Sequence, residues 1–322
     1  MLPSLLGWAL GSVLAAAASA GADGSPIRVP YERVASGHVI VQISVEGGAP
    51  VPFAVDSGAS VSVLAPDTWR AAGHDPDRGL KLRGKGAGGN LDAARLAMGV
   101  DVTLAGQPVT VGAAVVLPLP EGVTGEVALG GILGRDVLRR YVVELDESRH
   151  LLTLHPRRTA LDATGMVILP MRRLRAGLTS VTIGLGAHTA EAVVDFGAGV
   201  SVLNAAAVAL PGVEREADCG GTVVGADRQQ MDLSCLNVPD VVLGGTHLGP
   251  RRMHGSDLPI FSVLRLANAP ALILGNDVYA GRRLVLDDGR RELWISADVV
   301  TGAGATPEGV NAVVVDPVEA GG

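Results

Sequence analysis

An internal repeat constrains the fold of this chain more than any other feature of its sequence. Sliding the 322 residues against themselves by about 140 aligns landmarks from one end of the chain to the other, and repeats of this size indicate duplicated structural units. Ala54-Val55-Asp56 aligns with Val193-Val194-Asp195, and both continue into Gly-Ala and then Ser-Val-Leu. Further on, Ile132-Leu133-Gly134 aligns with Ile273-Leu274-Gly275. The sequence therefore predicts two homologous lobes.

The two copies set the predicted domain bounds. Lobe one spans residues 26–156 and lobe two spans residues 166–297, with a linker near residues 157–164. A chain of 322 residues is long enough for two domains of roughly 150 residues, each with its own core. The tail over residues 302–322 is rich in Gly, Ala and Val without a sustained helical or strand period, so we expect it to be flexible.

The apolar pattern within each copy is that of a β protein. Runs of four to eight residues rich in Val, Ile and Leu alternate with Gly, Pro or Asp turns. Aromatic residues make up only 3% of the chain, against 44 Gly and 19 Pro, which favours many short strands. Short helices are expected after Pro66 and Asn204, where Asp or Asn precedes an Ala-rich stretch. The predicted fold is all-β, with few short helices.

Charge and the N-terminal segment restrict partners and location. The net charge is −7 and no basic run exceeds a pair, so we expect no nucleic acid partner. Residues 5–18 are apolar and lead to Ala18-Ser19-Ala20, which predicts a signal peptide over residues 1–20 and an exported, periplasmic or secreted protein. An apolar first helix of the fold is the alternative, because no Lys or Arg precedes the run. No later segment is long enough to predict a membrane span in the mature chain.

The aligned Asp residues are the candidates for chemistry. In both copies an apolar strand runs directly into Asp-x-Gly-Ala, which places a carboxylate at a tight turn beside a buried strand. Burying such a charge is costly unless neighbouring groups stabilise it. Gly58 and Gly197 allow backbone amides to approach the carboxylate. Asp56 and Asp195 are therefore the predicted catalytic residues.

Other kinds of site are not supported by the sequence. The seven His and two Cys show no metal-ligand spacing, so neither a metal nor another cofactor is expected. Residues 84–89 match Gly-x-Gly-x-x-Gly, but they follow another motif instead of opening a βαβ unit, which argues against a dinucleotide site. Residues 58–62 end in Ser62 and so miss the Gly-x-Ser-x-Gly pattern of serine hydrolases.

On these residues the chain resembles the aspartic proteases, and specifically a bacterial protein with two retropepsin-like units in one chain, in the bilobal manner of pepsin. Asp56-Ser57-Gly58 fits the family's Asp-Thr/Ser-Gly signature, and Ile132-Leu133-Gly134 fits its second element, which closes over the catalytic loop. Lobe two repeats both as Asp195-Phe196-Gly197 and Ile273-Leu274-Gly275. The resemblance implies a bilobal all-β fold and an endopeptidase that takes a polypeptide substrate and uses no cofactor.

The family mechanism assigns roles to the residues that match. Asp56 and Asp195 would share one proton and one water molecule, because two close carboxylates cannot both ionise cheaply. The ionised member would take a proton from the attacking water while the protonated member donates to the substrate carbonyl, with a mildly acidic optimum. Loop support would come from Ser57, Gly58, Gly197, Gly134 and Gly275. A monomer is expected, since the chain is an internal pseudo-dimer.

The resemblance also implies a β-hairpin flap over the cleft. In lobe one the Gly-rich stretch over residues 83–90 fits, with Gly86 and Gly88 as candidates, and in lobe two residues 220–230 fit, with Gly225 and Ala226. Cys219 and Cys235 lie symmetrically around that second hairpin, as a cross-strand disulfide would. Two separate buried thiols are the alternative, because sequence does not show that their Cβ atoms approach.

Lobe two departs from the family pattern at two positions. Phe196 stands where the family has Thr or Ser, whose hydroxyl bonds across to the opposite loop, and Gly199 stands at the position of Ser60. Lobe two is therefore interpreted as the more eroded half. Two alternatives follow: a weak or inactive pseudoprotease that binds extended peptides by β-addition, or a homodimer that uses only the Asp56 lobe.

Overall fold

The structure is a computed structural model. It describes residues 24–82, 85–86, 89–90, 94–120, 124, 127–224 and 230–298. The predicted signal peptide and the predicted tail lie outside these residues. No helix within them is long and apolar enough to cross a membrane.

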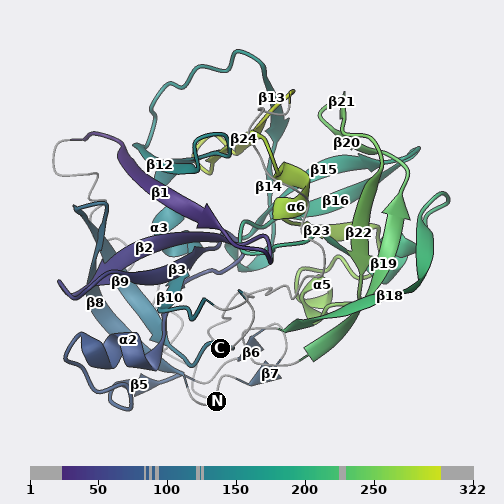
Figure 1. Cartoon of the computed structure of the whole chain (residues 1–322). Helices are drawn as coiled ribbons and strands as arrows, with labels where there is room; N and C mark the ends of the chain where they lie inside the picture. The colour runs from purple at the N-terminus through teal and green to yellow at the C-terminus, as the bar shows by residue number, and fades with distance from the viewer. Residues whose placement is uncertain are drawn as a thin grey trace, which may run out of the picture.

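Strands make up most of both halves of the chain (Figure 1). The elements of the first half are β1 (Ile27–Arg33), β2 (Val39–Val45), β3 (Val51–Val55), β4 (Ser62–Leu64), α2 (Pro66–Ala71), β5 (Leu80–Lys81), β6 (Lys85–Gly86), β7 (Gly89–Asn90), β8 (Arg95–Leu104), β9 (Gln107–Val116), β10 (Gly131–Leu133), α3 (Arg135–Leu138), β11 (Tyr141–Asp146) and β12 (Leu151–Pro156).

The second half begins at Met166, and nine residues, 157–165, separate it from the end of β12. Its elements are β13 (Met166–Pro170), β14 (Arg172–Arg173), η1 (Arg175–Gly177), β15 (Thr179–Leu185), β16 (His188–Val194), β17 (Val202–Leu203), α4 (Ala205–Val208), β18 (Glu214–Val224), β19 (Gln230–Val238), β20 (Val241–Leu243), β21 (Thr246–His247), β22 (Arg251–Gly255), α5 (Pro259–Val263), β23 (Ala271–Leu274), α6 (Asn276–Tyr279), β24 (Arg283–Asp287) and β25 (Glu292–Ser296).

The two halves repeat the same strand pairing. In lobe one, β3 pairs antiparallel with β2 on one side and parallel with β10 on the other. Strand β10 in turn pairs antiparallel with β4. In lobe two, β16 pairs with β15, lies parallel to β23, and β23 pairs antiparallel with β17. Each Asp-containing turn therefore leaves one strand and returns to another, with the Ile-Leu-Gly strand inserted between the two.

A shared sheet joins the lobes. Six of its strands, three from each half, follow one another in the order β1-β12-β11-β24-β25-β13, and beyond β1 the sheet continues into β2 and the other strands of lobe one. The β11–β24 pair, where the halves meet, is antiparallel, with Leu145 opposite Leu284. In Figure 1 the labelled strands β1, β12, β24 and β13 of this sheet lie in the upper part of the view, where lobe one, in purple and teal, meets lobe two, in teal, green and yellow. Backbone hydrogen bonds therefore hold the lobes together in addition to the linker, which fixes how the two Asp turns face each other.

The core agrees with the composition. Most of its buried side chains are Val, Leu, Ile and Ala, and the three Phe residues of the chain, Phe53, Phe196 and Phe261, are all buried. Both expected helices are present: α2 begins at Pro66, and Asn204 caps α4 by accepting the N–H of Ala207 at 2.9 Å. The predicted fold class, a two-lobed all-β protein with few short helices, is confirmed.

Candidate active site

Asp56 and Asp195 occupy the same place in the two lobes. Asp56 follows the last residue of β3 and Asp195 follows the last residue of β16. Asp56 Oδ1 accepts the backbone N–H of Gly58 at 2.7 Å and of Ala59 at 2.8 Å, and Asp195 Oδ1 accepts that of Gly197 at 2.7 Å. Both side chains are buried. Each turn therefore surrounds its carboxylate with its own amides.

The two turns face each other at their glycines. A Cβ atom on Gly58 would lie 2.5 Å from Asp195 Oδ2, and one on Gly197 would lie 2.2 Å from Asp56 Cγ. Neither position has room for a side chain, so glycine is required for this approach. The structure thus brings together the two carboxyl groups that the sequence singled out, one from each lobe.

Burial is the main influence on the protonation of this pair. It raises the pKa of Asp195 to about 6, although amide hydrogen bonds act in the opposite direction. Burial also raises the pKa of Asp56 well above its ordinary value, and the neighbouring Asp195 carboxylate raises it further. Because the two groups titrate as a unit, the pair retains one proton under mildly acidic conditions.

One half of the expected brace between the turns is present. Ser57 Oγ donates to the Val194 carbonyl oxygen at 3.1 Å and accepts the backbone N–H of Phe196 at 2.9 Å. Phe196 has no hydroxyl to return this interaction. Its ring is buried and packs edge-on against Tyr279. Ser57 therefore links the two Asp turns across the lobe boundary.

Gly134 and Gly275 support the turns by close packing. A Cβ on Gly134 would lie 2.6 Å from the Val61 carbonyl carbon, and one on Gly275 would lie 2.5 Å from that of Val200. Each glycine follows the Ile-Leu strand and lies directly against the segment that leaves the Asp turn. A larger residue at either position would push that segment, and with it the carboxylate, out of place.

Two serine–aspartate pairs, which the sequence analysis did not single out, reinforce these contacts. Ser62 Oγ accepts the Gly134 N–H at 3.0 Å and donates to Asp136 at 2.8 Å. Ser201 Oγ does the same with the Gly275 N–H at 3.0 Å and Asp277 at 2.7 Å. Burial raises the pKa of both aspartates. The signal was in the repeat, where both serines and both aspartates align.

Gly199 has an explanation other than erosion of lobe two. A Cβ at this position would lie 1.8 Å from the Ser36 carbonyl oxygen of lobe one, so no side chain fits. At the corresponding position, Ser60 Oγ donates to the Ala176 carbonyl oxygen of lobe two at 3.1 Å. Each Asp turn thus contacts a hairpin of the other lobe. The turn of lobe one does so through the Ser60 hydroxyl, and the turn of lobe two does so through the backbone of Gly199.

Arg135 makes a polar contact between the lobes that sequence reasoning missed. It follows Gly134, its backbone N–H donates to the Ala59 carbonyl oxygen at 2.8 Å, and its guanidinium pairs with Asp288 of lobe two. Both side chains of the ion pair are buried, at 5% and 7% exposure. Arg135 Nη1 also donates to Thr179 Oγ1 at 3.2 Å. Arg135 therefore connects the Asp56 turn, through the Ala59 carbonyl oxygen, to Asp288 and Thr179 of lobe two.

The flap candidates are only partly described. Gly86 lies in β6, opposite Gly89 of β7, whereas Gly88, Gly225 and Ala226 lie outside the described residues. In lobe two, β18 and β19 form a hairpin whose strands are joined by a disulfide between Cys219 and Cys235, with Cα atoms 5.6 Å apart.

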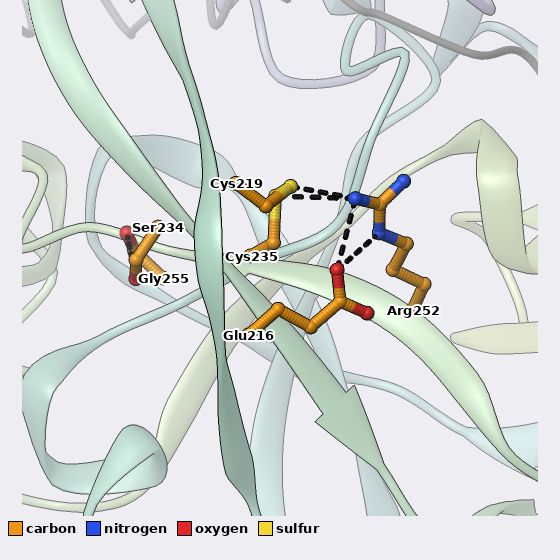
Figure 2. The surroundings of a disulfide bond; sticks show 6 residues. All are labelled: Glu216, Cys219, Ser234, Cys235, Arg252 and Gly255. Carbon is orange, nitrogen blue, oxygen red and sulfur yellow. Dashed lines mark hydrogen bonds and ion pairs between the residues drawn. A yellow bond between two sulfur atoms is a disulfide. The ribbon is translucent and has the colours of Figure 1, made fainter.

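The surroundings of the disulfide are polar on one side. Arg252 on β22 donates to Cys219 Sγ at 2.6 Å and forms an ion pair with Glu216 at 2.9 Å (Figure 2). Within the described part of the chain, one group of potential metal ligands lies close together, and it consists of the Glu216 carboxylate and the sulfur atoms of Cys219 and Cys235. Because the two sulfur atoms are bonded to each other, they do not form such a site here.

Comparison with known proteins gives one family match, and it lies in the first half of the chain. Residues 41–137, which include Asp56 and Gly134, match a family model described as aspartyl protease. Basic 7S globulin from soybean is a solved structure with 11% sequence identity and a TM-score of 0.49, covering 86% of this chain and 96% of its own. No curated protein gives a significant match.

Proposed function

We propose that the chain is an aspartic endopeptidase that uses Asp56 and Asp195 as a single catalytic pair. The observation that carries this proposal is the mutual approach of the two Asp turns, each with its glycine against the opposite carboxyl group. A pair of buried carboxyls that share a proton can act as acid and base at once. The match of residues 41–137 to an aspartyl protease model supports the same reaction class.

The proposed reaction needs only these two groups and water. The ionised carboxylate takes a proton from a water molecule as its oxygen attacks the carbonyl carbon of the scissile peptide. The protonated carboxyl donates its proton to the carbonyl oxygen, giving a tetrahedral diol. The first carboxyl then passes the proton it took from water to the leaving nitrogen, while the second takes a proton from a diol hydroxyl, so that the C–N bond breaks, a carboxylic acid and an amine are released, and the pair again holds one proton. Burial raises the pKa of both groups, so the singly protonated pair, and hence activity, is favoured at mildly acidic pH.

We further propose that the pair forms within one chain. Asp195 lies where a second Asp56 would have to lie in a homodimer, and Ser57 already bonds to the backbone of lobe two. The working protein would then be a monomer. Export, to the periplasm or the medium, is consistent with the predicted signal over residues 1–20 and with the disulfide, which persists in oxidising compartments.

Cleavage of an unfolded protein at acidic to neutral pH, with and without pepstatin, tests the proposal. Asp56→Asn and Asp195→Asn should each lower kcat by at least about 100-fold, since general acid–base catalysis contributes about 10²–10⁴-fold. Asp67→Asn is the matched control, because Asp67 is exposed on α2. Full activity in Asp195→Asn would contradict the proposed pair, and specific activity that falls on dilution would favour the homodimer.

A peptide-binding pseudoprotease is the second candidate, and the missing hydroxyl at Phe196 is the observation that favours it. Such a protein would bind extended peptides by β-addition and release no products. Retained peptide affinity with no cleavage after long incubation, unchanged in Phe196→Thr, would support it over the enzyme.

A further inference from the structure

The turn that carries Asp195 is held from within lobe two by the short helix α6. Asn276 Nδ2 donates to the Phe196 carbonyl oxygen at 2.7 Å. The Phe196 ring packs edge-on against Tyr279, with ring centroids 5.9 Å apart and planes at 89°. Both rings are buried, at 1% and 0% exposure. Because Phe196 directly follows Asp195, these contacts act on the backbone of the catalytic turn.

The corresponding positions of lobe one have no such ring contact. In the repeat, Phe196 aligns with Ser57 and Tyr279 aligns with Leu138. Ser57 uses its hydroxyl across the lobe boundary, whereas Phe196 packs inside its own lobe. The two aromatic residues therefore occur together, in the lobe that lacks the second hydroxyl of the brace.

We propose that Phe196 and Tyr279 are a positioning pair that holds Asp195 in place of the missing hydroxyl bond. An edge-on aromatic pair fixes both rings more tightly than their size alone does, and a packed interior transmits a change in side-chain volume to the neighbouring backbone. Phe196 is then a functional replacement for Thr or Ser. The inference rests on the proposed catalytic use of Asp195.

The chemistry of Tyr279 fits a packing role. Burial raises its pKa well above the ordinary value, and the carboxylates of Asp195 and Asp277 raise it further, so the phenol stays neutral. Its hydroxyl oxygen is buried and has no hydrogen-bonding partner among the described residues. The ring, with its contact to Phe196, is therefore the part of Tyr279 that acts on the turn.

Phe196→Thr separates the positioning role from a defect, because it restores the family hydroxyl but removes the ring. If Phe196 positions Asp195, kcat should fall at least tenfold with little change in KM, since a displacement of roughly 1 Å can cost about 100-fold in rate. If Phe196 is a defect, kcat should rise, and this result would overturn the proposal.

Tyr279→Leu places the lobe-one residue at the other side of the contact and should lower kcat by a similar factor. Trp294→Leu is the matched control, since Trp294 is also a buried aromatic but belongs to a separate cluster with Val142 and Val285. Tyr279→Phe keeps the ring and should retain more activity than Tyr279→Leu. Equal losses in these two Tyr279 variants would assign the effect to the hydroxyl and overturn the packing role.

Titration of ¹³C-carboxyl-labelled aspartates gives a readout that does not depend on activity. The signals of the coupled Asp56–Asp195 pair, identified by their loss or shift in Asp195→Asn, should titrate with a midpoint above the ordinary aspartate range, because burial raises the pKa of both groups. Tyr279→Leu should lower this midpoint, because a loosened turn admits water, and Trp294→Leu should not. An unchanged midpoint in Tyr279→Leu would overturn the positioning role. A shifted midpoint in a protein that cleaves nothing would keep it and contradict only the proposed catalysis.

Discussion

The two Asp turns have the same strand pairing, and Gly58 and Gly197 occupy the same place in them, but their side chains make contacts in different directions. The turn of lobe one is tied outward by polar groups: Ser57 and Ser60 bond to backbone oxygens of lobe two, and Arg135 pairs with Asp288. The turn of lobe two is tied inward, by Asn276 and by the contact of Phe196 with α6. The duplicated motif therefore places both carboxylates alike, although contacts to the other lobe hold the turn of lobe one and contacts within lobe two hold the turn of lobe two.

This difference has an energetic consequence. The outward ties depend on hydrogen bonds and a buried ion pair, so the loss of one partner leaves a polar group unpaired. The inward ties depend mainly on packing, so their loss leaves unfilled volume. Substitutions that remove an outward tie should accordingly disturb the contact between the lobes, whichever lobe carries the residue, and substitutions that remove an inward tie should disturb lobe two.

Arg135→Met should have the largest effect on stability. It leaves Asp288 buried without its partner, which typically costs about 3–5 kcal/mol. Denaturant unfolding measures this loss. Arg135→Met/Asp288→Leu should recover much of it, because no charge is then left unpaired. A single variant within about 1 kcal/mol of the wild type would mean that the ion pair does not hold the lobes together.

The two buried carboxyl groups should make stability depend on pH. The pKa of Asp195 is raised from 3.8 to about 6 in the folded protein, so protonation favours folding. The contribution of this group to the free energy of unfolding is complete below pH 4 and is lost as pH rises toward 6. The total loss is about 3 kcal/mol, because each pKa unit of the shift corresponds to about 1.4 kcal/mol. Asp195→Asn should flatten this part of the profile in urea unfolding at several pH values. An unchanged slope would show that the carboxyl is not buried as described.

Ser57→Ala should have a smaller effect on stability but a specific one on catalysis. It leaves the buried N–H of Phe196 without its acceptor, at a cost of about 1–3 kcal/mol. Ser60→Ala is the matched control, since it removes one hydroxyl bond between the lobes away from the carboxylates, at about 0.5–1.5 kcal/mol. Thermal unfolding and kcat should both rank Ser57→Ala as the more damaging. The reverse ranking would mean that Ser60, and not Ser57, makes the more important hydrogen bond between the lobes.

The sequence was sufficient to predict the parts of the site that the repeat duplicates. The all-β class, Asp56 and Asp195 follow from short apolar runs and an aligned motif, which are local patterns. The two serine–aspartate pairs could also have been found, because Ser62 and Ser201 align. The signal segment and the lobe bounds remain predictions.

The asymmetric parts could not be predicted in this way. Arg135 and Asp288 are 153 residues apart in sequence, and no spacing rule connects them. Tyr279 occupies a position that is Leu138 in the other copy, so the repeat presented it as one more apolar core residue. The sequence presents Gly199 as the loss of a polar residue, whereas in the structure the Ser36 carbonyl oxygen occupies the space that a side chain would need. Such features depend on how the lobes meet, which is a property of tertiary structure.

The sheet shared by the lobes also determines what half of this protein would do alone. A fragment ending after β12 would expose β11 along the edge that β24 covers in the intact chain. Unpaired edge strands recruit other strands, and the available strand of matching shape would be β11 of a second fragment. Separated halves would therefore associate or aggregate, because the covalent joining of two copies supplies each with the neighbour that its open edge requires.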